Sequence, residues 1–134
     1  MNRLQGKYVL ITGASLGLGR QLAIAFASEG VAGIAIVARG VEALNEVRDR
    51  IYEVAPNTQV LVVSADLTRQ EDIERVVATT LNEFNGHLDV LVNNASAIGP
   101  SPMPFLLDYP LEDFRNVIST NLVAPFLLIT ALLK

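Results

Sequence analysis

Short apolar runs with the length and β-branched content of buried strands recur along the chain. They occupy residues 8–11, 34–37, 60–63 and 90–92. Between them, apolar residues recur at helical spacing over 18–29, over 41–54 and over a stretch from 68 to about 84. This alternation predicts an α/β fold, a doubly wound parallel sheet of about four strands with flanking crossover helices.

Local signals place the helix ends and one long loop. Thr68-Arg69-Gln70-Glu71 fits a capping box, so a helix is expected to begin there. Four of the six prolines lie within 99–110, which we interpret as a loop over the carboxyl ends of the strands, where ligands bind in such sheets. Pro110 suits the first turn of a last helix. The apolar stretch 126–133 follows within it.

Composition and charge exclude several classes of protein. The chain has 134 residues, of which 51% are hydrophobic and 18% are charged, enough for a real core and too apolar for disorder. Its ten basic residues are scattered and its net charge is −4, which argues against a nucleic-acid partner. With no cysteine and only His87, we expect neither disulfides nor a multi-histidine metal site.

The sequence also indicates where in the cell the protein is expected. The N-terminal residues are polar and lack the apolar core of a signal peptide. No run approaches the roughly 18 apolar residues that a membrane span needs. We therefore expect a cytoplasmic protein without a membrane partner, formed as a single domain over 1–134.

A glycine-rich loop, Thr12-Gly13-Ala14-Ser15-Leu16-Gly17-Leu18-Gly19, lies between the first strand and the first helix. Gly13 permits a tight exit from the strand, Gly17 lets backbone approach a pyrophosphate, and Gly19 lets the helix pack closely on the sheet. The amides at the helix N-terminus then face the phosphates. The alternative is a purely structural turn, which the strand, turn and helix context makes less favoured.

The spacing Gly-x-x-x-Gly-x-Gly resembles the cofactor motif of the short-chain dehydrogenases/reductases. Asn93-Asn94-Ala95-Ser96 is similar to that family's Asn-Asn-Ala-Gly after the fourth strand, with Ser96 in place of the glycine. The resemblance implies a Rossmann-like sheet that binds a nicotinamide dinucleotide. The implied cofactor-binding residues are Gly13, Ser15, Leu16, Gly17, Leu18, Gly19, Arg39, Asp66, Leu67, Asn93, Asn94 and Ala95.

Arg39 at the end of the second strand favours NADP over NAD. NAD-binding sheets carry an acid there that accepts from the ribose 2′-hydroxyl, and no acid lies between Ile34 and Val41. The guanidinium of Arg39 suits a 2′-phosphate. Leu16 adds no second basic contact in the loop. The alternative is an ordinary surface arginine.

The polar residues that follow the third and fourth strands have roles implied by the resemblance. Asp66 and Leu67 lie beside the adenine, with the carboxylate accepting from its amino group. For Asp66 the alternative is a cap of the following helix. Asn93 and Asn94 brace the central strands, and Ala95 lies close to the cofactor.

Asn121 matches the helix asparagine that supports the proton relay in the family, so it is the candidate catalytic residue. Pro125 lies four residues later and has no N–H, so the carbonyl of Asn121 loses its helical partner and is free to hold a water or a ligand. The alternative is a simple kink in the helix.

The family's Tyr-x-x-x-Lys pair is missing from the chain. The only lysines are Lys7 and Lys134, and the residues four before them are Arg3 and Thr130. The strand with the catalytic serine is expected after Lys134. We therefore expect a truncated, catalytically incomplete NADP-dependent oxidoreductase. The alternatives are a catalytically silent dinucleotide-binding module or subunit and, more weakly, a binder of another phosphate ligand.

The resemblance also bears on partners. If active, the chain is expected to act on a small carbonyl or alcohol, but no residue names the substrate. The fourth strand is expected to be an open edge of the sheet. The last helix lacks the strands it would cover, so it is the expected contact in a homo-oligomer.

Overall fold

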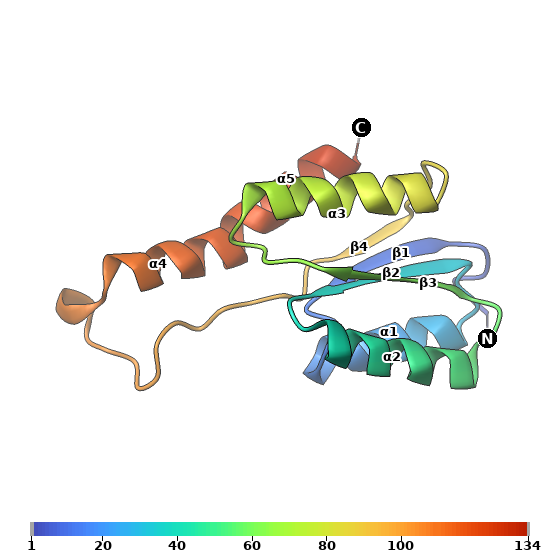
Figure 1. The fold of residues 1–134 in the computed structure, drawn as a ribbon, viewed down its shortest axis with the longest axis horizontal. Coiled ribbons are helices and arrows are strands. Elements are labelled where there is room, and N and C mark those ends of the chain that lie inside the picture. The colour runs from blue at the N-terminus through green and yellow to red at the C-terminus, as the bar shows by residue number, and fades with distance from the viewer. Residues whose placement is uncertain (1, 134) are drawn as a thin grey trace.

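The computed structural model describes residues 2–133 and contains one parallel sheet between helices (Figure 1). The strand order is β3-β2-β1-β4. The strands are β1 Tyr8–Thr12, β2 Gly33–Ala38, β3 Gln59–Ser64 and β4 Val90–Val92. Each predicted strand is present, within one residue at either end, and the expected α/β architecture is confirmed. From β1 the chain builds the sheet outward on one side with β2 and β3, and then crosses to the other side of β1 to add β4. Ligands bind at such a switch point in open parallel sheets.

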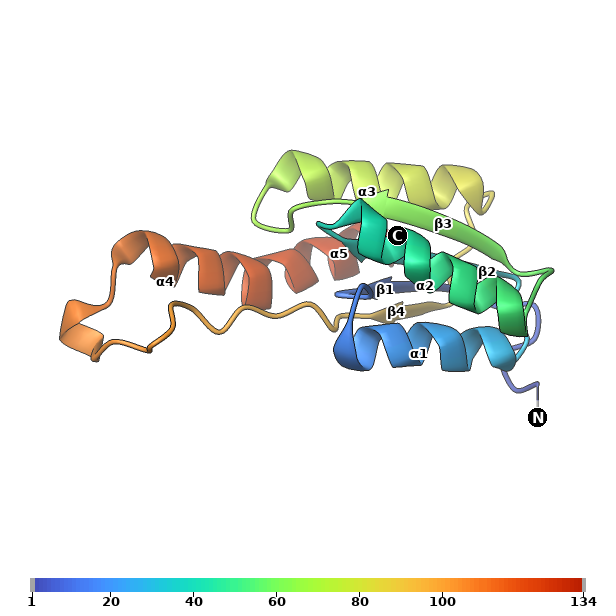
Figure 2. The same ribbon diagram turned by 60° about the horizontal axis from the view of Figure 1, so that its bottom comes forward.

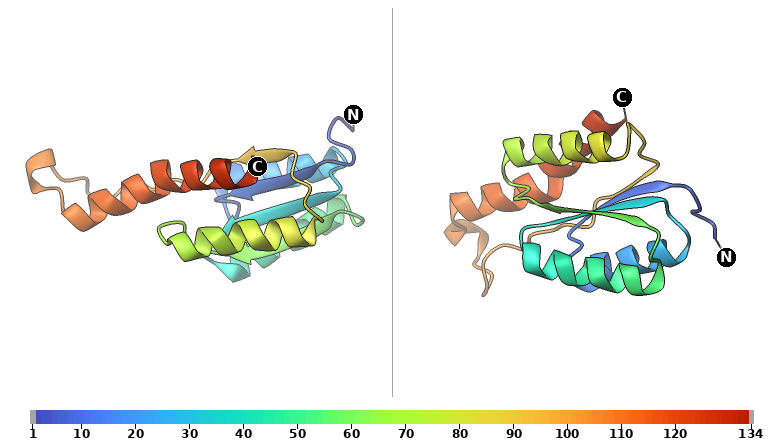
Figure 3. Two further views of the ribbon diagram at one scale, coloured as in Figure 1. Left: turned by 90° about the horizontal axis from the view of Figure 1, so that it is seen from above. Right: turned by 45° about the vertical axis from the view of Figure 1, so that its right-hand side comes forward.

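Helices cover both faces of the sheet. Helices α1 Gly17–Ser28 and α2 Val41–Val54 lie together on one face, and α3 Gln70–Glu83 and α5 Ala124–Leu132 lie on the other (Figures 1 and 3). Side chains alternate between the two cores because successive residues of a strand point to opposite faces. Val9 and Ile11 pack in the core under α1 and α2, whereas Leu10 packs in the core under α3 and α5.

One long helical run carries the C-terminal part of the chain. It consists of α4 Leu111–Ile118, the π-helical turn η2 Ser119–Val123, and α5. Before it, an extended loop and the short 3₁₀ turn η1 Leu106–Asp108 reach away from the sheet, and α4 returns alongside (Figure 2). Pro110 stands at the N-cap of α4, one position before the first turn in which it was expected.

The predicted capping box at Thr68 is wrong. Helix α3 begins at Gln70, with Arg69 as its N-cap and no side-chain cap. The Thr68 hydroxyl instead donates to the Asp66 carboxylate at 2.7 Å. This local hydrogen bond competes with capping, because the same threonine hydroxyl can bond either to a nearby side chain or to the backbone N–H groups at the helix start.

Among the described residues, β4 forms one edge of the sheet. Within the described residues β4 pairs with β1 alone, so its other edge is open. The C-terminal helix is also only partly covered: Leu128 is buried, whereas Phe126, Ile129 and Leu133 are exposed. The 22-residue run Leu111–Leu132 is long and apolar enough to cross a membrane by length and composition alone. One such helix is weak evidence for insertion. The expectation concerned an uninterrupted apolar run, and this helix is interrupted by Glu112, Asp113 and Arg115.

Candidate functional site

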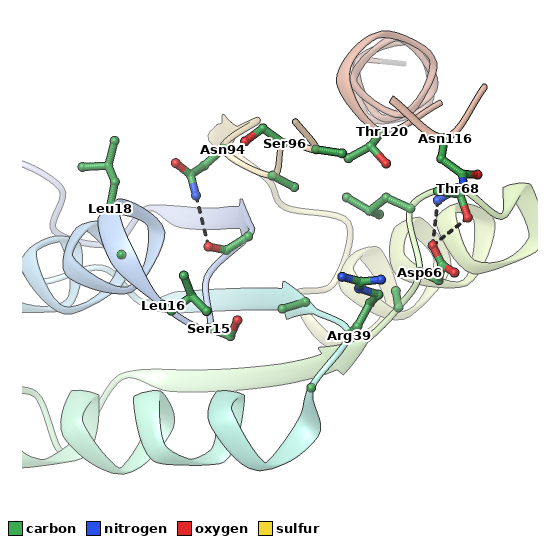
Figure 4. A pocket seen from close by; sticks show the side chains of 18 residues that line it. Ser15, Leu16, Leu18, Arg39, Asp66, Thr68, Asn94, Ser96, Asn116 and Thr120 are labelled. Carbon is green, nitrogen blue, oxygen red and sulfur yellow. Dashed lines mark hydrogen bonds between the residues drawn. The ribbon is translucent and has the colours of Figure 1, made fainter. Parts of the chain in front are cut away.

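A cleft of about 690 Å³ opens at the carboxyl ends of the strands (Figure 4). It is bounded by the glycine loop, the ends of β2 and β3, the segment after β4, and α4 with η2. The residues that line it are Gly13, Ser15, Leu16, Gly17, Leu18, Ala38, Arg39, Gly40, Ala65, Asp66, Leu67, Thr68, Asn94, Ala95, Ser96, Ala97, Asn116 and Thr120.

The glycine loop forms the floor of the cleft through backbone. Gly13 and Gly17 have φ of +64° and +59°, which strongly favour glycine. A Cβ on Gly17 would meet no atom within 4 Å, so open space lies in front of this backbone. Leu16 is the N-cap of α1, and among residues 2–133 no side chain caps this helix start. The first amides of α1 are therefore available to an anion in the cleft.

Gly19 does not line the cleft but lies where α1 meets the end of β4. A Cβ there would collide with the Gly13 carbonyl and the Asn94 amide nitrogen. The side chain of Asn94 uses the space, donating from Nδ2 to the Gly13 carbonyl at 3.0 Å. The close packing expected of Gly19 is therefore present.

Thr12 fastens β1 to the segment after β4, a role that the sequence analysis did not assign. Its buried hydroxyl accepts from the backbone N–H of Asn94 at 3.1 Å and of Ala95 at 3.0 Å. Thr12 and Asn94 brace the strands. The side chain of Asn93 is exposed and makes no hydrogen bond within the described part of the chain, so its expected bracing role stays a prediction.

The two hydrogen bonds that the Thr12 hydroxyl accepts are expected to contribute to the stability of the fold. Thr12→Val keeps the shape but removes the acceptor of the Ala95 N–H and one of the two acceptors of the Asn94 N–H, which also donates to the Val92 carbonyl at 3.1 Å. Both amides are partly buried, so we expect a loss of about 1–2 kcal/mol of unfolding free energy. Urea denaturation measures this loss. The matched control is Thr80→Val, because the buried Thr80 hydroxyl has no partner within the described residues. We expect that variant to be neutral or more stable, and equal losses in both would contradict the assignment.

Arg39 projects from the end of β2 into the cleft, near Asp66 (Figure 4). Its side chain is exposed and makes no ion pair among the residues that the structure describes. The neighbouring Arg69 differs, because its guanidinium pairs with Glu71 at 2.8 Å. Arg39 is therefore a cation at the cleft that is not committed to a carboxylate.

Asp66 stands at the end of β3 as a fixed carboxylate. The backbone N–H and the hydroxyl of Thr68 both donate to its Oδ1, at 3.0 and 2.7 Å. These two bonds hold the pKa of Asp66 below its ordinary value, and the nearby charges of Arg39 and Arg69 lower it further against partial desolvation. Asp66 stays ionised at neutral pH, and its Oδ2 is the oxygen not used by Thr68.

The far wall of the cleft comes from the C-terminal helical run. Asn116 and Thr120, one helical turn apart, face the cleft from α4 and η2 (Figure 4). Sequence reasoning missed both, because only the course of the preceding loop brings this helix over the strand ends. Asn121 does not line the cleft; its side chain instead bonds to the backbone of Ala97. Within the described residues no cluster of three metal-ligating side chains exists.

Comparison with known proteins settles the family. The family model described as short chain dehydrogenase matches residues 7–134. The chain belongs to the short chain dehydrogenases. The resemblance seen in the glycine loop and at 93–96 is confirmed by this match, which extends over nearly all of the chain.

Individual short chain dehydrogenases agree in sequence and in fold. A glucose 1-dehydrogenase of Gluconobacter oxydans (strain 621H) is 37% identical over 126 residues, covering 94% of this chain and 45% of that protein. An NAD⁺-bound xylitol dehydrogenase superposes with a TM-score of 0.85 at 29% identity, over 97% of this chain and 48% of the other. The L-sorbose reductase of Gluconobacter frateurii, complexed with NADPH and L-sorbose, superposes with a TM-score of 0.85 at 33% identity. The match covers 97% of this chain and 47% of the reductase.

The chain thus spans about half the length of these short chain dehydrogenases. The part that it shares holds the sheet, the glycine loop and the cleft. Both cofactor types occur among the similar structures, one with NAD⁺ and one with NADPH.

Proposed function

We propose that this chain binds NADP in the cleft and forms the nucleotide-binding part of an oxidoreductase. When bound, NADPH would donate a hydride to a carbonyl, or NADP⁺ would accept one from an alcohol. The single observation that carries the choice of NADP is Arg39, an exposed and unpaired cation among the described residues, at the rim of a cleft whose β2 end lacks an acid.

The residues present fit such a dinucleotide. The open backbone at Gly17 and the uncapped start of α1 suit a pyrophosphate. The guanidinium of Arg39 would pair with the 2′-phosphate through charge-assisted hydrogen bonds. The free Oδ2 of Asp66 would accept from the adenine amino group, and Leu67 and Ala95, which also line the cleft, would lie close to the cofactor. We also propose that Asn121 supports a proton relay through its backbone carbonyl.

The proposal includes little or no turnover by these 134 residues. The sequence contains no tyrosine four residues before a lysine. Without that pair nothing present lowers the pKa of a proton-donating tyrosine. The second candidate function, for these 134 residues taken alone, is a dinucleotide-binding module or subunit that does not complete the reaction itself.

Fluorescence titration of the purified chain with NADPH and NADH tests the binding half. We expect NADPH to bind roughly ten to a hundred times more tightly, since hydrogen bonds to a charged group contribute about 1.5–3 kcal/mol. Tighter binding of NADH would contradict the choice of cofactor. The turnover half is tested with NADPH and a panel of carbonyl substrates, and steady NADPH consumption above the no-substrate rate would overturn it.

A further inference from the structure

Within residues 2–133, every polar atom of Asp66 except Oδ2 has a hydrogen-bond partner. Its backbone N–H donates to the Asp72 carboxylate at 2.8 Å, and its carbonyl accepts from the N–H of Arg69 at 3.1 Å. Its Oδ1 accepts from both the N–H and the hydroxyl of Thr68 (Figure 4). The chain thus fixes this residue from several sides and leaves one carboxylate oxygen to accept from a ligand in the cleft.

The bond from Asp72 ties the backbone of Asp66 to a helix. Asp72 is the third residue of α3, and its side chain is only 22% exposed. A carboxylate at this position that reaches back to a backbone N–H has the geometry of one half of a capping box. Here the carboxylate passes the N-cap, Arg69, and binds the N–H of Asp66, six residues earlier. The orientation of Asp66 therefore depends on α3 as well as on its own turn.

Arg75, one turn further along α3, binds the same stretch of backbone on its other side. Its Nη2 donates to the Ser64 carbonyl at 2.7 Å and lies 3.7 Å from Oδ1 of Asp72. Between these two points, the N–H of Ala65 donates to the Ala38 carbonyl of β2 at 2.9 Å. Helix α3 therefore holds the end of β3 at two backbone groups, and the Asp72 carboxylate takes part in both contacts.

We infer that Asp72 is a positioning residue for the adenine: it holds the backbone of Asp66 so that Oδ2 meets the adenine amino group. This inference rests on the proposed function, in which that amino group donates to Oδ2. Asp72 does not line the cleft, so it acts through Asp66. Without the Asp72 carboxylate the turn samples other conformations, and the affinity for adenine falls with the fraction of molecules whose Oδ2 is in place.

Reduced nicotinamide hypoxanthine dinucleotide phosphate is the probe that isolates this contact. It keeps the 2′-phosphate, the pyrophosphate and the nicotinamide of NADPH, but it carries a carbonyl oxygen in place of the adenine amino group. A carbonyl oxygen cannot donate to Oδ2. We therefore expect the wild-type chain to bind NADPH about tenfold more tightly than this analogue, as loss of a hydrogen bond to a charged group allows.

The first variant is Asp72→Ala, titrated by fluorescence with NADPH and with the hypoxanthine analogue. We expect the dissociation constant of NADPH to rise about fivefold and that of the analogue to change by less than about twofold. A less stable fold would weaken both ligands alike, because they share every other contact. The Ser64 hydroxyl bonds to the Arg39 carbonyl at 2.7 Å, so a shift could spread to the 2′-phosphate, but that effect also cancels in the ratio of the two constants.

Two further variants test the chemistry at this position. Asp72→Asn keeps an acceptor oxygen with the same reach, so the ratio should stay within about twofold of wild type. Glu71→Ala is the matched control, because it removes the same charge from the same turn, where Glu71 is exposed and pairs with Arg69. It should leave the ratio unchanged, which separates the bond of Asp72 from the general effect of an acid near a helix N-terminus.

The outcomes are distinct. An unchanged ratio in Asp72→Ala would overturn the inference, as would an equal fall of the ratio in Asp72→Asn or in Glu71→Ala. If Asp72→Ala does not fold, Asp72→Ser decides with the same expected fall, because its hydroxyl ends one bond short of the carboxylate oxygen and serine suits a helix start. A wild-type chain that binds neither NADPH nor NADH would refute the proposed function. Wild-type preference for NADPH that persists in Asp72→Ala refutes only the role of Asp72.

Discussion

Gly19→Ala is expected to lower the free energy of unfolding by about 2–3 kcal/mol, although alanine normally favours a helix over glycine by about 1 kcal/mol. The sign reverses because the added Cβ would collide with the Gly13 carbonyl and the Asn94 side chain. Relieving the collision pushes α1 away from the sheet and breaks the 3.0 Å bond from Asn94 to Gly13. Urea denaturation followed by circular dichroism measures the loss.

The matched control is Gly40→Ala. A Cβ on Gly40 would meet nothing within 4 Å, and its φ of −84° is open to any residue. Because Gly40 is the N-cap of α2, where alanine is less favourable than glycine, we expect a loss of no more than about 1 kcal/mol. If Gly19→Ala is as stable as Gly40→Ala, the tight packing of α1 against the end of β4 is wrong.

Arg39→Asp is expected to weaken NADPH binding about a hundredfold and to leave NADH binding unchanged or slightly tighter. The substitution removes the partner of the 2′-phosphate and places a like charge there, which together corresponds to about 3 kcal/mol. For NADH the new carboxylate can accept from the ribose 2′-hydroxyl. Fluorescence titration of both cofactors measures the change in preference.

Arg69→Asp makes the same change in charge close by and serves as the control. Arg69 also lowers the pKa of Asp66, but it is paired with Glu71 and does not line the cleft. It should affect NADPH binding only through screened long-range charge, by less than about threefold. An equal loss of NADPH and NADH in Arg39→Asp would mean that Arg39 supports the cleft without reading the 2′-phosphate.

The strands and the first three helices were predictable because their signals are local. An apolar run such as Val90–Val92 or an amphipathic stretch such as Val41–Val54 fixes its own structure and its buried face. The glycine loop was predictable for the same reason. The error at Thr68 shows the limit of local signals. Its hydroxyl had two possible partners, and it bonds to the Asp66 carboxylate and not to the backbone at the start of α3.

The far wall of the cleft was not predictable from local patterns. Asn116 and Thr120 enter the site only because a long loop carries α4 back over the strand ends. The partner of Asn121 lies 24 residues away, in a segment without regular structure. The bracing role of Asn93 stays a prediction, because its side chain is exposed at the end of β4 and makes no hydrogen bond within the described residues.

The fastening of β1 to the segment after β4 also has a consequence for how the chain folds. The Asn94–Gly13 bond joins residues 81 positions apart, whereas β1 and β2 are linked through α1 alone. Closing so long a loop carries a larger entropic cost and is slow compared with local pairing. We therefore expect the β1–β4 docking step to complete the cleft after the local pairings have formed. A nucleotide that binds only the completed cleft would stabilise the folded state over the unfolded state. The folded fraction of the chain would therefore rise with the nucleotide concentration.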